Sequence, residues 1–84
     1  MKNKDVVEAF LRHRKASTKN LCSTGIRLLS YNTCIAEHYE DEIIGNATKY
    51  STTSSIHLFH VRPYVDRWTT RNVPRNSWTL YNYL

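Results

Sequence analysis

The alternation of apolar and polar positions is clearest in residues 29–61, where it predicts a strand, a hairpin turn, a returning strand and a helix. Bulky side chains at alternate positions from Leu29 to Tyr39 would share one face, because successive side chains of a strand point to opposite faces. The other face of this strand would hold only small residues, namely Ser30, Asn32, Cys34 and Ala36. This contrast predicts that another element, such as a helix, packs closely on the small side.

Two positions beside this strand carry further information about the sheet. Ile26 and Leu28 are out of phase with Leu29, which indicates either a β-bulge or a strand start that is buried on both faces. The acidic run at residues 40–42 is expected to form the hairpin turn, and residues 43–50 the returning strand. Within that strand, Gly45 indicates either a bulge or the close approach of another part of the chain.

A helix is expected after the returning strand. The Ser/Thr run at residues 51–55 offers several N-cap candidates. The apolar residues that follow recur at intervals of three and four, which is the helical period: Leu58, Val61, Val65 and Trp68. Pro63 interrupts this stripe, and a proline inside a helix costs about 3 kcal/mol. We therefore expect either a break near Arg62 or a new helix with Pro63 in its first turn.

The N-terminal part of the chain predicts a short helix at residues 4–15, capped by Asn3, with an apolar stripe of Val6, Val7, Phe10 and Leu11. Residues 15–20 are polar and are expected to form a loop. Residues 21–23 are expected to form a short strand that ends in a Thr24-Gly25 turn.

The C-terminal residues 69–84 are rich in Asn, Thr and aromatic residues, and near their end Trp78, Leu80, Asn82 and Leu84 alternate with Thr79, Tyr81 and Tyr83. They predict either a last strand on the sheet edge, which we favour, or an aromatic arm that folds on a partner. The chain as a whole is expected to be one α+β domain, residues 1–84. It would consist of a short N-terminal helix, a small antiparallel sheet of three or four strands, a second helix packed on the sheet, and a C-terminal strand or arm. Residues 4–61 would form the core and 62–84 an extension.

Charge divides the chain into basic ends and a mildly acidic centre. The net charge is +5. Residues 1–19 carry six Lys or Arg against two acidic residues, and residues 62–84 carry four Arg against Asp66. Residues 20–61 carry two cations against four acidic residues. Such a positive field attracts nucleic-acid phosphates, anionic lipid or acidic proteins, and it also serves solubility alone.

No apolar run approaches the ~20 residues of a membrane span, and the start Met-Lys-Asn-Lys-Asp has no apolar signal region. We therefore expect a soluble, cytoplasmic protein without a membrane partner. Two cysteines in that compartment are expected to be free thiols.

The central stretch resembles a family of small uncharacterised proteins encoded by tailed bacteriophages, with a Tyr-Asn-Thr-x-Ile-Ala strand followed by a Thr-Lys-Tyr-Ser-x-Thr-Thr-Ser segment. The resemblance covers residues 4–61 and implies a phage origin and a small α+β fold, but no reaction. Residues 62–84 depart from the family pattern. The matching residues are Lys19-Asn20-Leu21, Ser23-Thr24-Gly25, Tyr31-Asn32-Thr33, Ile35-Ala36, Asn46, Thr48-Lys49-Tyr50-Ser51 and Thr52-Thr53-Ser54.

Catalytic and metal sites are poorly supported by the residue spacing. The zinc-ligand types Cys22, Cys34, His57 and His60 do not have the spacing of common structural sites. Cys34 falls in the middle of the predicted strand, where packing is the usual role of a thiol. Three adjacent carboxylates at a hairpin tip are typical of a solvated turn. We therefore predict no enzyme activity, no metal and no cofactor.

Binding remains as the predicted function. One hypothesis is an accessory protein that docks on nucleic acid, or on a nucleic-acid-handling host complex. The other is an inhibitor that binds a protein of a bacterial defence system, such as CRISPR or restriction, through its C-terminal aromatic and arginine residues. The sequence does not determine the oligomeric state. The candidate binding residues are Arg12, Arg14, Lys15, Arg62, Arg67, Arg71, Arg75, Trp78 and Tyr81.

Overall fold

The computed structural model describes residues 2–48, 50 and 52–84, with side chains from 52 to 55 excluded. Two α-helices, six strands and two 3-10 turns are assigned within these residues. In chain order they are α1 (Asn3–Leu11), β1 (Lys15–Ser17), β2 (Leu21–Thr24), β3 (Arg27–Ser30), β4 (Thr33–Tyr39), β5 (Glu42–Gly45), α2 (Thr52–Val61), η1 (Arg62–Tyr64), β6 (Arg67–Trp68) and η2 (Tyr81–Tyr83).

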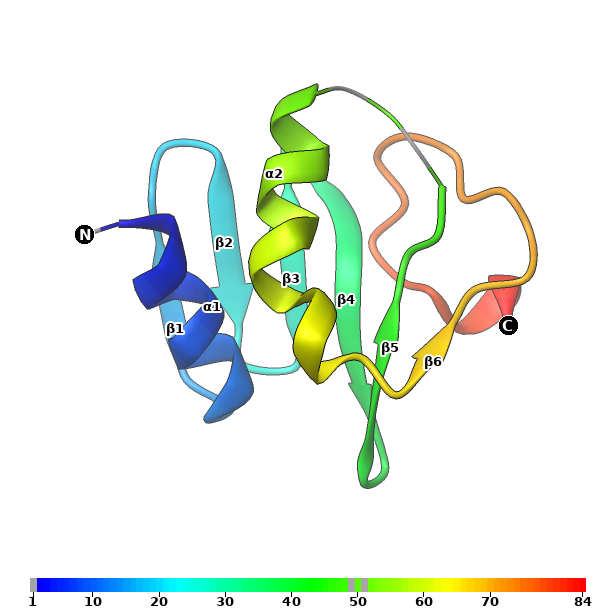
Figure 1. Ribbon diagram of the computed structural model, residues 1–84, viewed down its shortest axis with the longest axis horizontal. Helices are drawn as coiled ribbons and strands as arrows, with labels where there is room; N and C mark the ends of the chain where they lie inside the picture. Colours follow the sequence, from blue (N-terminus) through cyan, green and yellow to red (C-terminus); the bar gives the residue numbers. More distant parts are fainter. Residues whose placement is uncertain (1, 49, 51) are drawn as a thin grey trace.

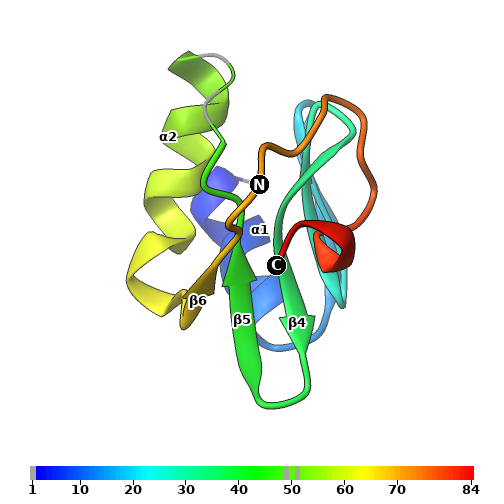
Figure 2. The same cartoon turned by 90° about the vertical axis from the view of Figure 1, so that its right-hand side faces the viewer.

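The six strands form one sheet in the order β1-β2-β3-β4-β5-β6. Strands β1 to β5 are antiparallel neighbours, and β6 pairs in parallel with β5 after the chain has passed through α2. Both helices lie on one face of the sheet, and residues 69–84, here called the tail, lie on the other (Figures 1 and 2). We call these the helical face and the tail face. The α+β class is as predicted, but the sheet has six strands rather than three or four.

The helical face covers the larger core. Its buried members are Val6, Val7, Phe10, Leu21, Leu28, Ile35, Ala36 and Val61. The predicted stripe of the first helix thus packs inward, but α1 ends at Leu11 instead of residue 15, and His13 takes a positive φ of 57°. The predicted Asn3 cap is wrong, because Lys2 is the capping residue and Asp5 accepts a hydrogen bond from its backbone N–H at 2.8 Å.

The predicted long strand of residues 29–39 is interrupted by a tight turn. Ser30 pairs with Thr33, and the two residues between them, Tyr31 and Asn32, have φ values of 50° and 69°. Positive φ at both central positions is the geometry of the two-residue hairpin turn whose twist matches the flanking strands. The hairpin connects β3 and β4, and it was missed because only Asn32 is a typical residue for such a turn.

A register shift lies between Leu28 and Leu29, where the phase break of the sequence indicated a bulge. Leu28 pairs with Ala36 and Leu29 with Cys34, so Ile35 is the extra residue. A bulge of this kind turns neighbouring side chains to the same face. Ile35 and Ala36 therefore both join the core of the helical face, which corrects the predicted division of β4 into a bulky and a small face.

The returning strand is shorter than predicted, since β5 ends at Gly45. A Cβ atom on Gly45 would lie 2.8 Å from the Trp68 ring and 2.8 Å from the Val65 side chain. The expected close approach at this glycine is therefore confirmed. The chain leaves the sheet at Asn46, whose side-chain amide donates to the Cys34 carbonyl oxygen at 3.0 Å.

The second helix follows the predicted stripe only as far as Val61. Val65 and Trp68 lie beyond the helix, and Trp68 belongs to β6. Helix α2 ends at Val61 and η1 begins at Arg62 with Pro63 near its start, so the predicted break at the proline is confirmed. The N-cap candidates at residues 51–55 lie outside the described residues or have no described side chains. The chain then passes from η1 through residues 65 and 66 into β6.

The tail is neither the edge strand nor the free arm that the sequence suggested. The last strand, β6, consists of Arg67 and Trp68, and the tail then crosses the other face of the sheet without further strands. It completes a second core of Cys34, Ile44, Val73 and Leu80. Thr48 accepts a hydrogen bond from the Val73 N–H at 2.8 Å, and Tyr50 donates one to the Val73 carbonyl oxygen.

Across the described residues, neither helix is long and apolar enough to cross a membrane.

Candidate functional site

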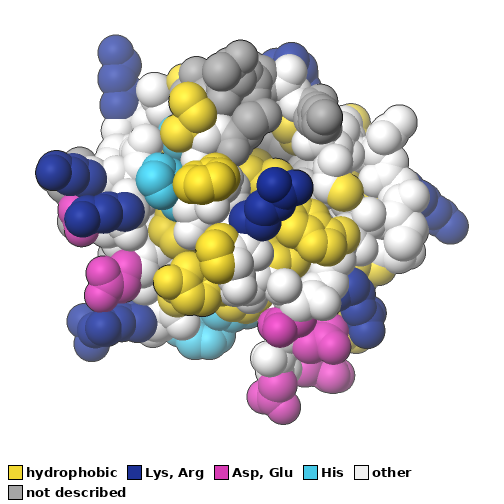
Figure 3. Space-filling view, in the orientation of Figure 1, with side chains coloured by type: hydrophobic (Ala, Val, Ile, Leu, Met, Phe, Trp, Pro, Cys, Tyr) yellow, Lys and Arg dark blue, Asp and Glu magenta, His cyan; other side chains and the backbone are white. Residues whose placement is uncertain are grey.

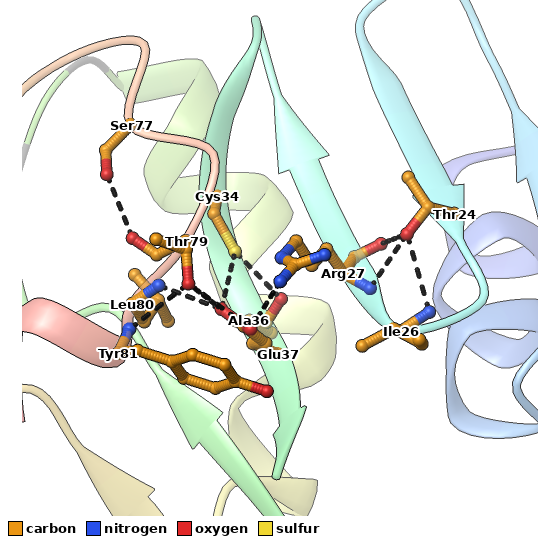
Figure 4. A network of polar contacts seen from close by, with 10 residues as sticks. All are labelled: Thr24, Ile26, Arg27, Cys34, Ala36, Glu37, Ser77, Thr79, Leu80 and Tyr81. Carbon is orange, nitrogen blue, oxygen red and sulfur yellow. Dashed lines mark hydrogen bonds and ion pairs between the residues drawn. The ribbon is translucent and has the colours of Figure 1, made fainter.

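A buried ion pair connects the sheet to the tail. The Glu37 side chain is fully buried on β4, and its carboxylate lies 3.2 Å from the Arg27 guanidinium on β3. The same carboxylate accepts hydrogen bonds from the Thr79 hydroxyl at 3.1 Å and from the Leu80 N–H at 2.8 Å (Figure 4). This carboxylate on β4 thus has partners on β3 and on the tail, which together compensate the cost of burying its charge.

The Cys34 thiol lies beside this network and is inaccessible. Burial, and next the Glu37 carboxylate, raise the pKa of the Cys34 thiol well above its ordinary value. Its Sγ atom contacts the Ala36 carbonyl oxygen at 3.2 Å. A thiol without a thiolate fraction is a poor nucleophile, so Cys34 acts here as a packing residue.

Trp78 and Tyr81 reach the surface above the ion pair. The Arg27 guanidinium carbon lies 4.6 Å from the centre of the Trp78 ring and 5.9 Å from that of Tyr81. Trp78 is 63% exposed, and Tyr81 is 43% exposed and meets Tyr39 edge-on at 5.3 Å. Burial, and next the Glu37 charge, raise the pKa of the Tyr81 hydroxyl. The result is a fixed arginine between two exposed aromatic rings.

The tail-side face of strands β1 to β3 continues outward from Trp78. Ala16 packs on the helical core, so its strand neighbours Lys15 and Ser17 point to the tail face. Lys15 pairs with Thr24, Ser17 with Cys22, and Cys22 with Leu29, which places all of them on that face. We call this surface the platform; it consists of Lys15, Ser17, Cys22, Thr24 and Leu29, none of which is fully buried.

The part of the chain that builds the platform has an unusual charge pattern. Residues 9–36 contain five Lys or Arg and no Asp or Glu. Arg27 is neutralised in space by Glu37, and Arg12 pairs with Glu8 at the surface, which leaves Arg14, Lys15 and Lys19. Acidic side chains gather instead at the tip of the β4–β5 hairpin, at the lower edge of the molecule in Figure 3. The sheet therefore has a basic end at β1 and an acidic end at this tip.

The predicted N-terminal cations lie together in the chain segment that leads into the sheet. Arg12, Arg14 and Lys15 are all exposed, just after α1 and at the start of β1. Arg12 forms an exposed ion pair with Glu8 at 3.1 Å, and the Arg14 carbonyl oxygen accepts a hydrogen bond from Ser23. The fold places Lys15 on the same face of the sheet as the predicted tail residues Trp78 and Tyr81.

The predicted C-terminal arginines do not form one patch in the same way. The Arg62 guanidinium lies over the Trp68 ring at 5.8 Å, and that of Arg75 over the Tyr50 ring at 5.7 Å. Arg67 is paired with Glu42 at 3.4 Å. Arg71 is exposed, and its backbone N–H donates to the Tyr83 carbonyl oxygen at 3.2 Å.

The residues that sequence reasoning missed are Arg27 and Glu37. The sequence pattern places Glu37 on a strand face but does not predict its full burial. The signal that it does offer is a carboxylate inside a largely apolar strand, which requires a cationic partner if it is buried. The partner could not be chosen without the register, which pairs Arg27 directly with Glu37.

The helical face carries a separate hollow and exposed apolar side chains. A cavity of about 430 Å³ lies between α1 and the end of α2, lined by Lys4, Val7, Glu8, Leu11, Arg12 and Tyr64. Phe59 is 69% exposed, and Ile56 and Tyr64 are each 52% exposed. Figure 3, which views this face, shows hydrophobic side chains open to solvent over α2.

The cysteines and histidines do not assemble a metal centre within the described part of the chain. Cys22 and Cys34 are both free thiols, each beside Leu29 in the sheet. The His57 ring nitrogen Nδ1 lies 2.6 Å from the Ser30 hydroxyl, and burial lowers the pKa of His57.

No protein-family model matches the chain, and neither a curated protein nor a solved structure matches it. The resemblance to tailed-phage proteins stays a prediction. A function therefore has to be inferred from the residues of the site.

Proposed function

We propose that this chain is a non-enzymatic, phage-encoded accessory protein that docks on nucleic acid through the platform and the cations beside it. The observation that carries the proposal is the coincidence of two features in one place. Residues 9–36 have five cations and no carboxylate, and Lys15, Ser17 and Thr24 are exposed on the sheet face that they build.

The physical basis is the attraction of a cationic surface for phosphates. Each phosphate that a Lys or Arg neutralises releases condensed counterions, so the affinity falls steeply as salt is raised. Arg14, Lys15 and Lys19 are exposed, and no ion pair is assigned to them within the described residues. Acidic residues stand at the other end of the sheet, so a polyanion would be directed toward β1.

The non-enzymatic part of the proposal is supported by the condition of the two most reactive side chains. Cys34 is buried and its pKa is raised by that burial. Glu37 is fully buried and already engaged by Arg27, Thr79 and Leu80. Neither group is free to transfer a proton to a substrate or to attack one.

Two double variants with the same change in net charge test the location of the site. In the first, Arg14→Glu is combined with Lys15→Glu; in the matched control, Arg71→Glu is combined with Arg75→Glu. Binding to a labelled single-stranded 20-mer is measured by anisotropy over a salt series. We expect the first variant to lose most of its affinity and to show a salt slope reduced by about one per lost phosphate contact. The control should lose much less.

A larger loss in the control would move the site to the C-terminal extension. Equal losses in both variants would show that only net charge matters, and no binding by the unsubstituted protein would reject the proposal. Both variants carry their changes at exposed positions, so circular dichroism is expected to show an unaltered fold.

The alternative is a protein-directed inhibitor of a bacterial defence system such as CRISPR or restriction. It is favoured by the exposed rings of Trp78 and Tyr81 with the partly buried Arg27 beside them, because these residue types are enriched at interface hot spots. A host complex that handles nucleic acid would suit either proposal. A pull-down with nuclease treatment distinguishes the two proposals. The inhibitor is supported if a host protein co-purifies in stoichiometric amount after nuclease treatment and no longer co-purifies with the Trp78→Ala variant.

A further inference from the structure

We propose that the ring of Trp78 stacks against an unpaired base, so that the nucleic acid recognised is single-stranded. This inference rests on the proposed function and narrows it from nucleic acid in general to exposed bases. It concerns a side chain that phosphate attraction alone does not require.

The geometry around Trp78 leaves an aromatic surface open. The Arg27 guanidinium carbon lies 4.6 Å from the centre of the Trp78 ring, and Trp78 is nevertheless 63% exposed. An indole that is supported by a cation on one side and open to solvent elsewhere can accept a base as a further stacked layer. Among the exposed aromatic residues that the structure describes, only Trp78 and Tyr81 lie beside a guanidinium that is paired with a buried carboxylate.

The backbone on both sides of Trp78 is anchored to the sheet. Before it, the Cys34 N–H donates to the Ser77 carbonyl oxygen at 2.7 Å, and the Asn76 N–H donates to the Thr33 hydroxyl at 2.8 Å. After it, Thr79 and Leu80 both donate to Glu37 (Figure 4). An exposed tryptophan on a backbone held this way loses little conformational freedom when it binds.

The surroundings of Trp78 also suggest the direction in which a bound nucleic-acid strand would run. On one side, Tyr81 leads through Tyr39 to the acidic hairpin tip. On the other side lies the platform, with Thr24 and Lys15 on the same face. A nucleic-acid strand that stacks one base on Trp78 would therefore run toward β1, where cations meet its phosphates, and away from the carboxylates.

This arrangement discriminates single strands from duplexes. A base in a duplex is stacked on both faces and cannot be offered to a side chain without unpairing, whereas an unpaired base can. Stacking is tolerant of sequence because every base has a π-face. We therefore expect oligothymidylate and oligouridylate to bind alike, and a blunt duplex of the same length to bind more weakly.

The test uses the intrinsic fluorescence of Trp78. A Trp68→Phe background leaves Trp78 as the sole tryptophan, and its emission is titrated at low salt with 12-mers of dT and U and with a 12-base-pair duplex. We expect saturable quenching by both single strands and at least tenfold weaker binding of the duplex. In the unsubstituted background, Trp78→Ala should weaken single-strand binding by roughly 5- to 150-fold without changing the salt slope. Trp78→Phe should lose less.

Tyr64→Ala is the control, because it removes another exposed aromatic ring, from the helical face, and should leave binding unchanged. If Trp78→Ala binds like the unsubstituted protein while the Arg14 and Lys15 variant loses binding, stacking is rejected and the proposed function stands. Binding of the duplex as tight as that of the single strands also rejects it. If no nucleic acid binds at all, both proposals fail. The quenching measurement needs no change at Trp78, so it decides even if Trp78→Ala does not fold.

Discussion

The two faces of the sheet are covered by different kinds of structure. On the helical face, two regular helices satisfy their own backbone hydrogen bonds and need to supply only an apolar stripe. On the tail face, an irregular segment has to find partners for its backbone elsewhere. Thr33, Thr48 and Glu37 each accept a hydrogen bond from a tail N–H, and the backbone of Cys34 donates to Ser77.

This difference explains why polar residues are buried on the tail face. Glu37 and Thr79 are both buried, and each contributes a contact that a regular helix would have made unnecessary. A covering layer without secondary structure can thus be stable, provided that the sheet beneath it carries acceptors and donors in the right places. The same layer then holds Trp78 at the surface.

The largest effect is expected from removal of the tail. A chain truncated after Trp68 would expose Cys34 and Ile44 and would take away two of the donors to Glu37. Because an 84-residue domain has only about 5–15 kcal/mol of stability, we expect no cooperative unfolding. Urea titration followed by near-ultraviolet circular dichroism measures this. A sigmoidal unfolding transition at a urea concentration near that of the full chain would instead show that the tail is an arm that the fold does not need.

A smaller but still large effect is expected from Glu37→Ala. The substitution leaves the Arg27 guanidinium and the Thr79 and Leu80 donors without their acceptor, and breaking such a buried pair costs about 3–5 kcal/mol. Glu42→Ala is the matched control, because Glu42 also pairs with an arginine, but at the surface, where a pair is worth about 0–1 kcal/mol. Free energies of unfolding from urea titration compare the two. Equal losses would mean that Glu37 does not anchor the tail.

The sequence predicted the helical face better than the tail face for a physical reason. The stripe of α1 and the break at Pro63 are local patterns, since each depends on residues three or four apart. The tail obeys no such period, because its conformation is set by partners up to 43 residues away, such as Glu37 for Leu80. Its alternating aromatic residues imitated a strand, although Leu80 is buried and Trp78 is exposed on the same parity.

The candidate site shows the same limit. Lys15, Trp78 and Tyr81 were predicted as binding residues from charge and aromatic character, but as members of separate patches. That they share a face of the sheet depends on the register of β1 with β2 and on the path of the tail. Neither can be obtained from residue spacing. The hairpin that splits the predicted strand was likewise not predicted, because Tyr31 is not a typical turn residue although its φ is 50°.

The smallest effect is expected in the pH dependence of stability. It distinguishes the two faces, because histidines contact the helical face and the tail contains none. His38 and His57 both contact the helical side: His38 Nε2 lies 2.7 Å from the Phe10 carbonyl oxygen, and His57 meets Ser30. Burial, as the largest cause, lowers the pKa of both residues below the ordinary value of about 6.5. The charge of His13, which stacks on His38 at 3.8 Å between ring centres, also lowers the pKa of His38.

The sign of the effect follows from proton binding in the two states. Below about pH 6.5 the unfolded chain takes up protons on these histidines that the folded chain resists, so stability falls as pH falls. We expect the thermal midpoint to decrease from pH 7.5 to 5.5, and His57→Gln to reduce that decrease. The described tail residues 69–84 contain no histidine, so a Leu80→Ala variant should lower the midpoint at every pH without changing its pH dependence. A midpoint that rises on acidification would contradict the lowered pKa of His38 and His57 in the folded protein.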